Sequence, residues 1–164
     1  MGQKRRHKGL SFLVLISLFS CGNKEGFDEQ KAISKEGLTP KAVVFEVPAQ
    51  ELNNSPQNLF IWLRNNPEYE FSNIFLIATL KVNNEIYIQD TLEYAMTAPD
   101  GSWLGKGFTE LKENKLWWKE GLVIPQEGPV QIEIAQAMRN NGKPEGVPKL
   151  KGIVSLGISI EDQQ

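Results

Sequence analysis

Two residue types that carry much of enzyme and metal chemistry are almost absent from this chain, which has one cysteine, Cys21, and one histidine, His7. Because a single cysteine cannot form a disulfide within the chain, stability must come from a packed core. The absence of histidine after His7 excludes Ser-His-Asp and Cys-His nucleophilic systems and histidine-based zinc or iron sites. Complete phosphate-loop, dinucleotide-binding and EF-hand motifs are missing as well. We therefore expect no enzyme activity, no cofactor and no metal site.

The apolar stretch near the N-terminus is too short to span a membrane. Residues 10–19 are apolar apart from two serines, and a spanning helix needs about 20 such residues. The stretch follows a basic start and ends at Ser20-Cys21, which is the order of features in a secretory signal peptide. Cysteine directly after Leu-x-Ser resembles a bacterial lipobox, in which the thiol is acylated. We expect a signal peptide over 1–20 and lipidation of Cys21; the alternative is an ordinary signal peptide with an incidental cysteine.

Positive charge becomes scarce once this segment is removed. The whole chain has 18 basic and 20 acidic residues, and loss of residues 1–20 leaves 14 and 20, a net charge of −6. No basic cluster remains that would favour nucleic acid or an anionic lipid surface. Acyl chains on Cys21 would hold the protein on a membrane, since each buried methylene contributes about 0.8 kcal/mol. Because Gly22 is not an aspartate, we expect the outer membrane and its periplasmic face.

The chain after the signal is short enough for one domain. Residues 21–40 are polar and contain glycine, which favours a lipid-anchored tether, and 41–164 are expected to form the domain. The one helix that the pattern allows is short and lies near 109–115. About eight short strands with Pro and Gly turns and no βαβ rhythm indicate an all-β fold, an antiparallel β-sandwich of jelly-roll or immunoglobulin-like type. The clearest β-rich runs are 43–47, 59–63, 74–82, 85–94, 130–136 and 154–160.

Two local patterns give more detail on these strands. Asn83-Asn84 separates two β-rich runs, and asparagine tolerates positive φ, so the pair predicts a two-residue hairpin. In 130–136 and 154–160 the even-numbered residues are largely apolar, and their neighbours are polar or small. Such period-two alternation predicts strands with one buried face and one face in water.

The densest segment is 90–119, which contains three of the four tryptophans. Pro99-Asp100-Gly101 is turn chemistry, because Pro presets φ and Gly accepts positive φ. Trp103 follows in the same loop, with Leu104 and Lys106 beside it. Trp117 and Trp118 are adjacent in a predicted strand and must therefore face opposite sides, one toward the core. Asp90-Thr91-Leu92 also fits an O-glycosylation pattern of Bacteroidota, with Thr91 as the acceptor.

Three interpretations of this tryptophan-rich loop stay open. In the first, the loop folds back and its tryptophans fix it to the sandwich. In the second, it is a partner-binding surface, because aromatic anchors dominate protein interfaces. In the third, its rings stack on carbohydrate. The candidate contact residues are Pro99, Asp100, Gly101, Trp103, Leu104, Lys106, Trp117 and Trp118.

An ordered set of short motifs resembles the gliding-motility lipoprotein family GldH. The likeness spans residues 59–139, and the lipoprotein signal is shared in addition. The motifs are Leu63-Arg-Asn-Asn66, Phe71-Ser-Asn-Ile-Phe75, Asp90-Thr-Leu-Glu-Tyr94, Pro99-Asp-Gly-x-Trp-Leu-Gly-Lys-Gly107, Lys112-Glu-Asn-Lys115 and Gln136-Ala-Met-Arg139. This resemblance implies a cell-envelope lipoprotein of Bacteroidota. It also implies a non-enzymatic accessory or structural part in gliding motility and type IX secretion, with other lipoproteins and envelope proteins of that machinery as partners. The alternative function is a surface lipoprotein that binds glycans through the aromatic loop of its β-sandwich.

Overall fold

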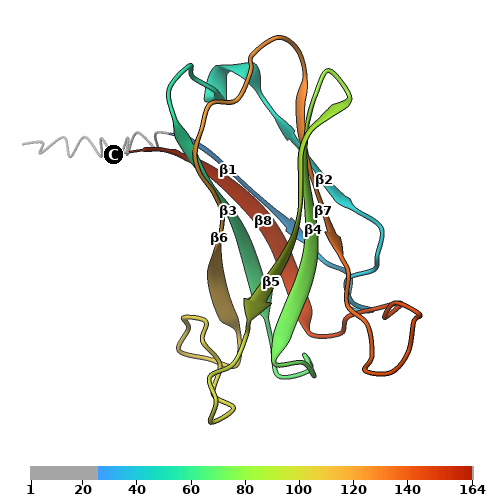
Figure 1. The fold of residues 1–164 in the computed structure, drawn as a ribbon. Coiled ribbons are helices and arrows are strands. Elements are labelled where there is room, and N and C mark those ends of the chain that lie inside the picture. The colour runs from blue at the N-terminus through green and yellow to red at the C-terminus, as the bar shows by residue number, and fades with distance from the viewer. Residues whose placement is uncertain (1–25, 164) are drawn as a thin grey trace, which may run out of the picture.

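The computed structural model describes residues 26–163, which form a sandwich of two β-sheets (Figure 1). The predicted signal peptide and Cys21 lie outside the described residues. The first sheet has the order β1-β8-β3-β6 and the second the order β2-β7-β4-β5, and all pairings are antiparallel. The strands are β1 (Phe27–Ala32), β2 (Val43–Val47), β3 (Gln57–Asn65), β4 (Asn73–Val82), β5 (Glu85–Ala95), β6 (Lys112–Leu122), β7 (Val130–Gln136) and β8 (Ile153–Asp162).

The connections decide between the two sandwich types that the sequence left open. Every connection crosses from one sheet to the other except the β4–β5 hairpin, which stays within the second sheet. Eight strands connected in this way form a jelly roll, in which strands distant in sequence become neighbours. β1 thus pairs with β8, and β2 with β7. The predicted all-β sandwich of about eight strands is confirmed.

The core lies between the two sheets and follows the alternation in the sequence. The buried apolar side chains of the first sheet include Leu59, Ile61, Leu63, Leu116, Trp118, Leu156, Ile158 and Ile160. Those of the second sheet are Phe45, Val47, Ile74, Leu76, Ala78, Leu80, Val130, Ile132 and Ile134. Each fully buried side chain of this size contributes about 1.5–3 kcal/mol relative to exposure. These side chains supply the packed core that a chain without disulfides needs.

The predicted hairpin between β4 and β5 is confirmed. Asn83 and Asn84 have φ values of 54° and 65°, and Val82 pairs with Glu85 across the turn. Two consecutive left-handed residues match the twist of the flanking strands, which is why asparagine suits both positions.

The predicted short helix near 109–115 is wrong, because residues from Lys112 onward form β6. The single helical element within residues 26–163 is a 3-10 turn, η1 (Ala49–Glu51). None of the described helices has the length and hydropathy to cross a membrane. The reason for the error is that Glu113 and Lys115 face outward on a strand whose inner positions, Asn114 and Leu116, are buried. Period-two burial was hidden because the first of these buried positions is polar.

The first strand lies inside the segment predicted as a tether, so the sheet begins well before residue 41. β1 is an edge strand, and its inward-facing positions include Glu29 and Lys31 as well as Phe27. Lys31 donates from Nζ to the carbonyl oxygen of Val44 and lies 5.0 Å from the ring centroid of Phe45. The methylenes of the lysine cover the core while its charge reaches a polar partner. The alternation of apolar residues that marks the other strands is therefore weak here.

The register of β8 also differs in one position from the predicted alternation. Leu156, Ile158 and Ile160 face the core as predicted, but a register shift between Arg64 and Asn65 of β3 interrupts the ladder. Ile153 is buried in consequence, and Val154 is exposed. A bulge of this kind exchanges the two faces of a strand beyond it.

Candidate partner-binding surfaces

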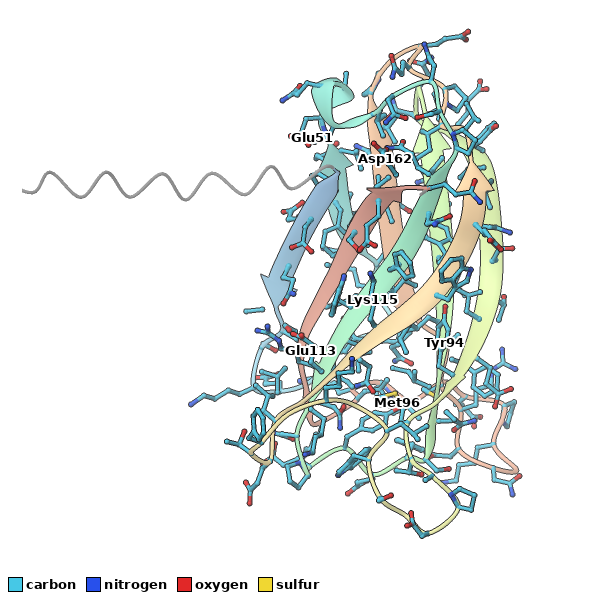
Figure 2. All side chains as sticks on the ribbon, turned by 90° about the vertical axis from the view of Figure 1, so that its left-hand side faces the viewer. Glu51, Tyr94, Met96, Glu113, Lys115 and Asp162 are labelled. Carbon is cyan, nitrogen blue, oxygen red and sulfur yellow. The ribbon has the colours of Figure 1, made fainter. Side chains whose placement is uncertain are left out.

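The residues between β5 and β6, 96–111, form a loop at one end of the sandwich (Figures 1 and 2). Thr97 and Trp103 make an antiparallel bridge, and Lys106 and Glu113 make a second. The Lys106–Glu113 bridge has both backbone hydrogen bonds, each 2.8 Å long. The β5–β6 loop is thus two small folded turns rather than an open chain.

The first turn is built by Pro99-Asp100-Gly101, as predicted. Gly101 has a φ of 84°, and its N–H donates to the carbonyl oxygen of Ala98. The Asp100 carboxylate accepts hydrogen bonds from the backbone N–H and the hydroxyl of Ser102, at 2.9 and 2.6 Å. These bonds favour the charged form and hold the pKa of the Asp100 carboxyl below its usual value. Pro99, Asp100 and Gly101 are exposed at the tip.

Trp103 fixes this turn to the body of the domain. Its side chain is half-buried against the core, and its ring centroid lies 6.3 Å from that of Tyr69, with the planes tilted by 45°. Tyr69 is itself buried, and its hydroxyl donates to the carbonyl oxygen of Asn73 at 2.7 Å. Burial raises the pKa of the Tyr69 phenol, so the hydroxyl stays neutral. This geometry supports the first of the three interpretations for Trp103 itself.

Other apolar residues of the same loop are exposed to solvent, unlike Trp103. Leu104 is 55% exposed, Phe108 is fully exposed and Leu111 is 38% exposed, all on the same loop. Lys106 is exposed between them. Gly105 brings the chain against the buried amide of Asn114, where a Cβ would lie 2.8 Å from its Oδ1. The loop therefore combines a fixed backbone with apolar side chains in water.

The two adjacent tryptophans of β6 separate as predicted. Trp118 is 5% exposed and belongs to the core, whereas Trp117 is 47% exposed on the outer face of the first sheet. The indole N–H of Trp118 donates to Asp90 Oδ2 at 3.0 Å, and Lys119 pairs with the same carboxylate at 3.1 Å. These bonds link β6 to β5 across the side of the sandwich. Trp118 thus has no surface to offer a partner.

A second contact closes the same side. The hydroxyl of Tyr94 on β5 donates to the carbonyl oxygen of Trp117 on β6, at 2.5 Å. Burial, with a smaller effect of the nearby Asp90 carboxylate, raises the pKa of Tyr94 to about 12. The neutral phenol can therefore keep donating throughout the physiological range.

The outer face of the first sheet, which is turned toward the viewer in Figure 2, carries Trp117 and two aromatic residues that the sequence analysis did not single out, Phe60 and Trp62. Phe60 meets Trp117 edge to face, with centroids 4.7 Å apart and planes at 89°. Lys115 lies 3.9 Å from the Phe60 centroid and 5.5 Å from that of Trp62. Lys115 also pairs with Glu161 of β8 at 2.6 Å. Charge and aromatic rings are thus interleaved over β3, β6 and β8.

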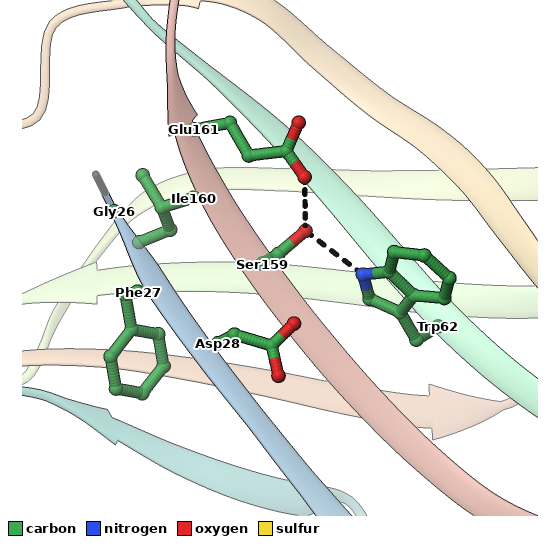
Figure 3. Close-up of a pocket in the computed structure, with 7 residues that line it drawn as sticks. All are labelled: Gly26, Phe27, Asp28, Trp62, Ser159, Ile160 and Glu161. Atoms are coloured by element: carbon green, nitrogen blue, oxygen red, sulfur yellow. Dashed lines mark hydrogen bonds between the residues drawn. The ribbon is translucent and has the colours of Figure 1, made fainter. Parts of the chain in front are cut away.

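A hollow of about 270 Å³ opens on this face over β8 (Figure 3). We call it the β8 hollow; its lining residues are Gly26, Phe27, Asp28, Trp62, Ser159, Ile160 and Glu161. The indole N–H of Trp62 donates to Ser159 Oγ at 2.9 Å, and Ser159 Oγ donates to Glu161 Oε1 at 3.1 Å. Polar and aromatic groups converge here, and none of the lining residues within 26–163 is basic.

The structure brings together some of the predicted site residues and separates others. Pro99 to Lys106 share one loop, but Trp117 lies on the face of the first sheet and Trp118 lies in the core. Thr91 is exposed on β5, where its acceptor role remains a prediction. Among residues 26–163 no group of three or more His, Cys, Asp or Glu side chains could hold a metal ion.

Phe108 and Trp62 are the candidate contact residues that the sequence analysis missed. Phe108 had a usable signal, because it is an isolated aromatic between Gly107 and Thr109 in a polar stretch outside any alternation. Trp62 had none, because it lies within a continuous apolar run. Its outward direction follows only from the pairing of β3 with β8, which places it beside Gly157.

Comparison with known proteins agrees with the predicted family. The GldH lipoprotein family matches residues 27–160. The gliding motility lipoprotein GldH of Flavobacterium johnsoniae is 39% identical over 158 residues, which cover 96% of this chain and 98% of that protein. The gliding motility lipoprotein GldH homologue of Christiangramia forsetii is 42% identical over 151 residues, or 92% of each chain.

The chain also has a weaker similarity to a solved structure, that of dimeric latent PorU from Porphyromonas gingivalis. The TM-score is 0.31 and the identity 12%, over 84% of this chain and 13% of that chain. A similarity at this level supports no inference about either fold or function. The family match and the relatives of about 40% identity do support one, because they cover nearly the whole sequence. This chain belongs to the GldH lipoprotein family.

Proposed function

We propose that this protein is a cell-envelope lipoprotein, acylated on Cys21, that supports gliding motility and type IX secretion through protein contacts and without enzymatic activity. The main support for the proposal is that the backbone of the β5–β6 loop is held by hydrogen bonds while the side chains of Leu104 and Phe108 are exposed to solvent. Family membership supports the setting of the gliding machinery. The loop supplies a surface on which contacts can form.

The energetics of the loop suit association. Buried aromatic and aliphatic anchors contribute most of the free energy of binding at protein interfaces. A flexible loop loses conformational freedom when it binds, and that loss weakens the complex. In this protein Trp103 and the Lys106–Glu113 bridge order the loop in advance. Phe108 and Leu104 can therefore enter a partner with little further ordering of the backbone.

The position of the anchor supports a loop that points away from the membrane. Gly26 is five residues beyond Cys21, so the acylated cysteine can lie at most about 18 Å away. Gly26 precedes the start of β1, which lies beside the β8 end that contains Ile160. The β5–β6 loop lies beyond Asn65 at the far end of β3, and the nine residues of that strand span about 30 Å.

The first test measures partner recovery from the envelope. The tagged, acylated protein is captured from detergent extracts, and co-purified envelope proteins are quantified for the double variant Leu104→Ser, Phe108→Ser. The control is Ile86→Ser, which removes a 60% exposed apolar side chain next to the β4–β5 hairpin, at the opposite end of the sandwich from the β5–β6 loop. The loop variant should lose at least about tenfold in recovery, since one or two anchors contribute that much. Equal recovery with both variants contradicts the proposal.

The second test determines the membrane face. Since Cys21 is the only cysteine and its thiol would be acylated, Thr109→Cys introduces one free thiol on the exposed loop. A membrane-impermeant maleimide should label this thiol only after the outer membrane is permeabilised, as a periplasmic location requires. Labelling on intact cells would place the loop at the cell surface instead. Cys21→Ser should release the protein from the membrane fraction, and a variant that stays membrane-bound would argue against acylation.

A further inference from the structure

The β8 hollow is a shaped site rather than a shallow gap between side chains. It lies between Asp28 on the edge strand β1 and Trp62 on β3, with Ser159 of β8 at its base (Figure 3). Gly157 pairs with Gln30 and Trp62 in the adjacent row, and a Cβ there would lie 2.6 Å from Gln30 Cγ and 2.8 Å from the carbonyl oxygen of Glu29. Small residues on β8 thus leave the flank of the indole open.

The orientation of Trp62 is set before any ligand arrives. Its N–H is bonded to Ser159, the Ser159 hydroxyl is bonded to Glu161, and Glu161 is paired with Lys115 at 2.6 and 2.8 Å. This chain of four groups runs from β3 through β8 to β6. Each link constrains the next, so the ring offers a fixed surface at small entropic cost to a ligand.

The charged lining residues that the structure describes, Asp28 and Glu161, are both acidic. Lys115 balances the Glu161 carboxylate from the β6 side, which leaves the Asp28 carboxylate as the excess charge beside the indole. Asp28 is exposed and forms no salt bridge within residues 26–163. An aromatic face next to a carboxylate attracts a cation, since the ring quadrupole and the negative charge act together.

We propose that the β8 hollow binds the guanidinium group of an arginine from a partner protein. A guanidinium is planar and can stack on the Trp62 indole while it donates two parallel hydrogen bonds to the Asp28 carboxylate. A lysine ammonium has no planar group to stack and cannot donate such a parallel pair of hydrogen bonds. The net charge of −6 after the signal peptide also favours a basic partner. The inference rests on the proposed function, and it adds a second, polar contact to the apolar contact of the β5–β6 loop.

The test uses a guanidinium probe and its neutral isostere. The acylated protein, labelled with ¹⁵N in its backbone and indoles, is titrated in a polyoxyethylene detergent with N-acetyl-arginine amide and N-acetyl-citrulline amide. The resonances of the Trp62 indole N–H and the Asp28 amide should shift saturably with the arginine compound. The protein should bind the citrulline compound at least about fivefold more weakly. Absence of saturation, equal binding of both compounds, or preferential saturation by a neutral oligosaccharide or by phosphatidylethanolamine vesicles overturns the proposal.

Two matched variants assign the effect to the hollow. Asp28→Asn should weaken arginine binding about tenfold, because it removes the charged acceptor and keeps the shape. Glu120→Gln changes an exposed acid outside the hollow and should leave binding unchanged. In envelope capture, Asp28→Asn should also lower partner recovery; full recovery by a variant that no longer binds arginine overturns the partner assignment. That result is distinct from failure of the loop variant, which tests the apolar contact alone.

Discussion

Replacement of Trp103 by alanine should destabilise the domain, whereas replacement of Phe108 by alanine should not. Both residues are aromatic and belong to the β5–β6 loop, so a loop that contributes nothing to folding would tolerate both changes equally. Trp103 packs against Tyr69 and the core, while Phe108 is fully exposed. The pair therefore separates the residue that positions the loop from the residue that the loop presents.

The magnitude follows from the burial of the Trp103 ring. Removal of a fully buried Trp or Phe costs about 3–5 kcal/mol, and a half-buried ring with one aromatic neighbour should cost about 2 kcal/mol. For a domain of this size that loss lowers the melting temperature by roughly 6 °C. Phe108→Ala should change the free energy of unfolding by less than about 0.5 kcal/mol, as for most surface substitutions. Trp103→Phe should recover about half of the loss.

Urea unfolding followed by far-ultraviolet circular dichroism is the suitable assay, since tryptophan fluorescence would change with the substitution itself. Midpoint and slope should be fitted together, because a shift of the midpoint at constant slope reports stability. A Trp103→Ala variant as stable as the parent would refute the role of this residue in fixing the loop. A destabilised Phe108→Ala variant would refute the exposed position of that side chain.

Three further outcomes follow from the structure. Asp90→Ala should destabilise the domain by about 1–3 kcal/mol, since the buried indole N–H of Trp118 loses its acceptor. Asp90→Asn should cost less, and equal stability of the parent and both variants would contradict the link between β5 and β6. Gly157→Ala should cost about 1–3 kcal/mol through displacement of β1, because its Cβ would meet the backbone of Glu29; thermal melts of this variant and of the exposed-site control Glu120→Ala decide the point. The free energy of unfolding should stay constant up to about pH 10 and then fall as the pH rises through about 12. The reason is that the pKa of Tyr94 is about 12 in the folded protein and 10.0 in the unfolded chain, so the folded state favours the neutral phenol more strongly. Tyr94→Phe should reduce this alkaline loss, and an unchanged pH profile would show that Tyr94 does not contribute to it.

Much of the sandwich could be predicted because its strands combine simple patterns with local turn chemistry. Ile132 and Ile134 alternate with polar neighbours, and Asn83-Asn84 specifies its own hairpin through positive φ. The choice between jelly roll and immunoglobulin topology could not be made, because strand order depends on contacts between distant segments. β1 shows this most clearly, since Lys31 owes its inward position to the carbonyl of Val44 on the other sheet.

The features of the candidate site that could be predicted are likewise those set by neighbours in the chain. The turn at Gly101 and the opposite directions of Trp117 and Trp118 could be predicted, because each depends on neighbours in the chain. The β8 hollow could not, because Asp28, Trp62 and Ser159 come from three strands whose pairing is a property of the whole fold. The anchoring of Trp103 by Tyr69 is likewise a contact between two loops that are far apart in sequence.

The central claim is that the exposed end of the β5–β6 loop contacts other proteins of the envelope. The most direct measurement is cross-linking in living cells with a photoreactive amino acid at position 108, compared with one at position 86 on the opposite end of the sandwich. We expect a covalent adduct with an envelope protein from position 108 and none from position 86. Adducts from position 86 alone, or from neither position while the acylated protein remains functional, would contradict it.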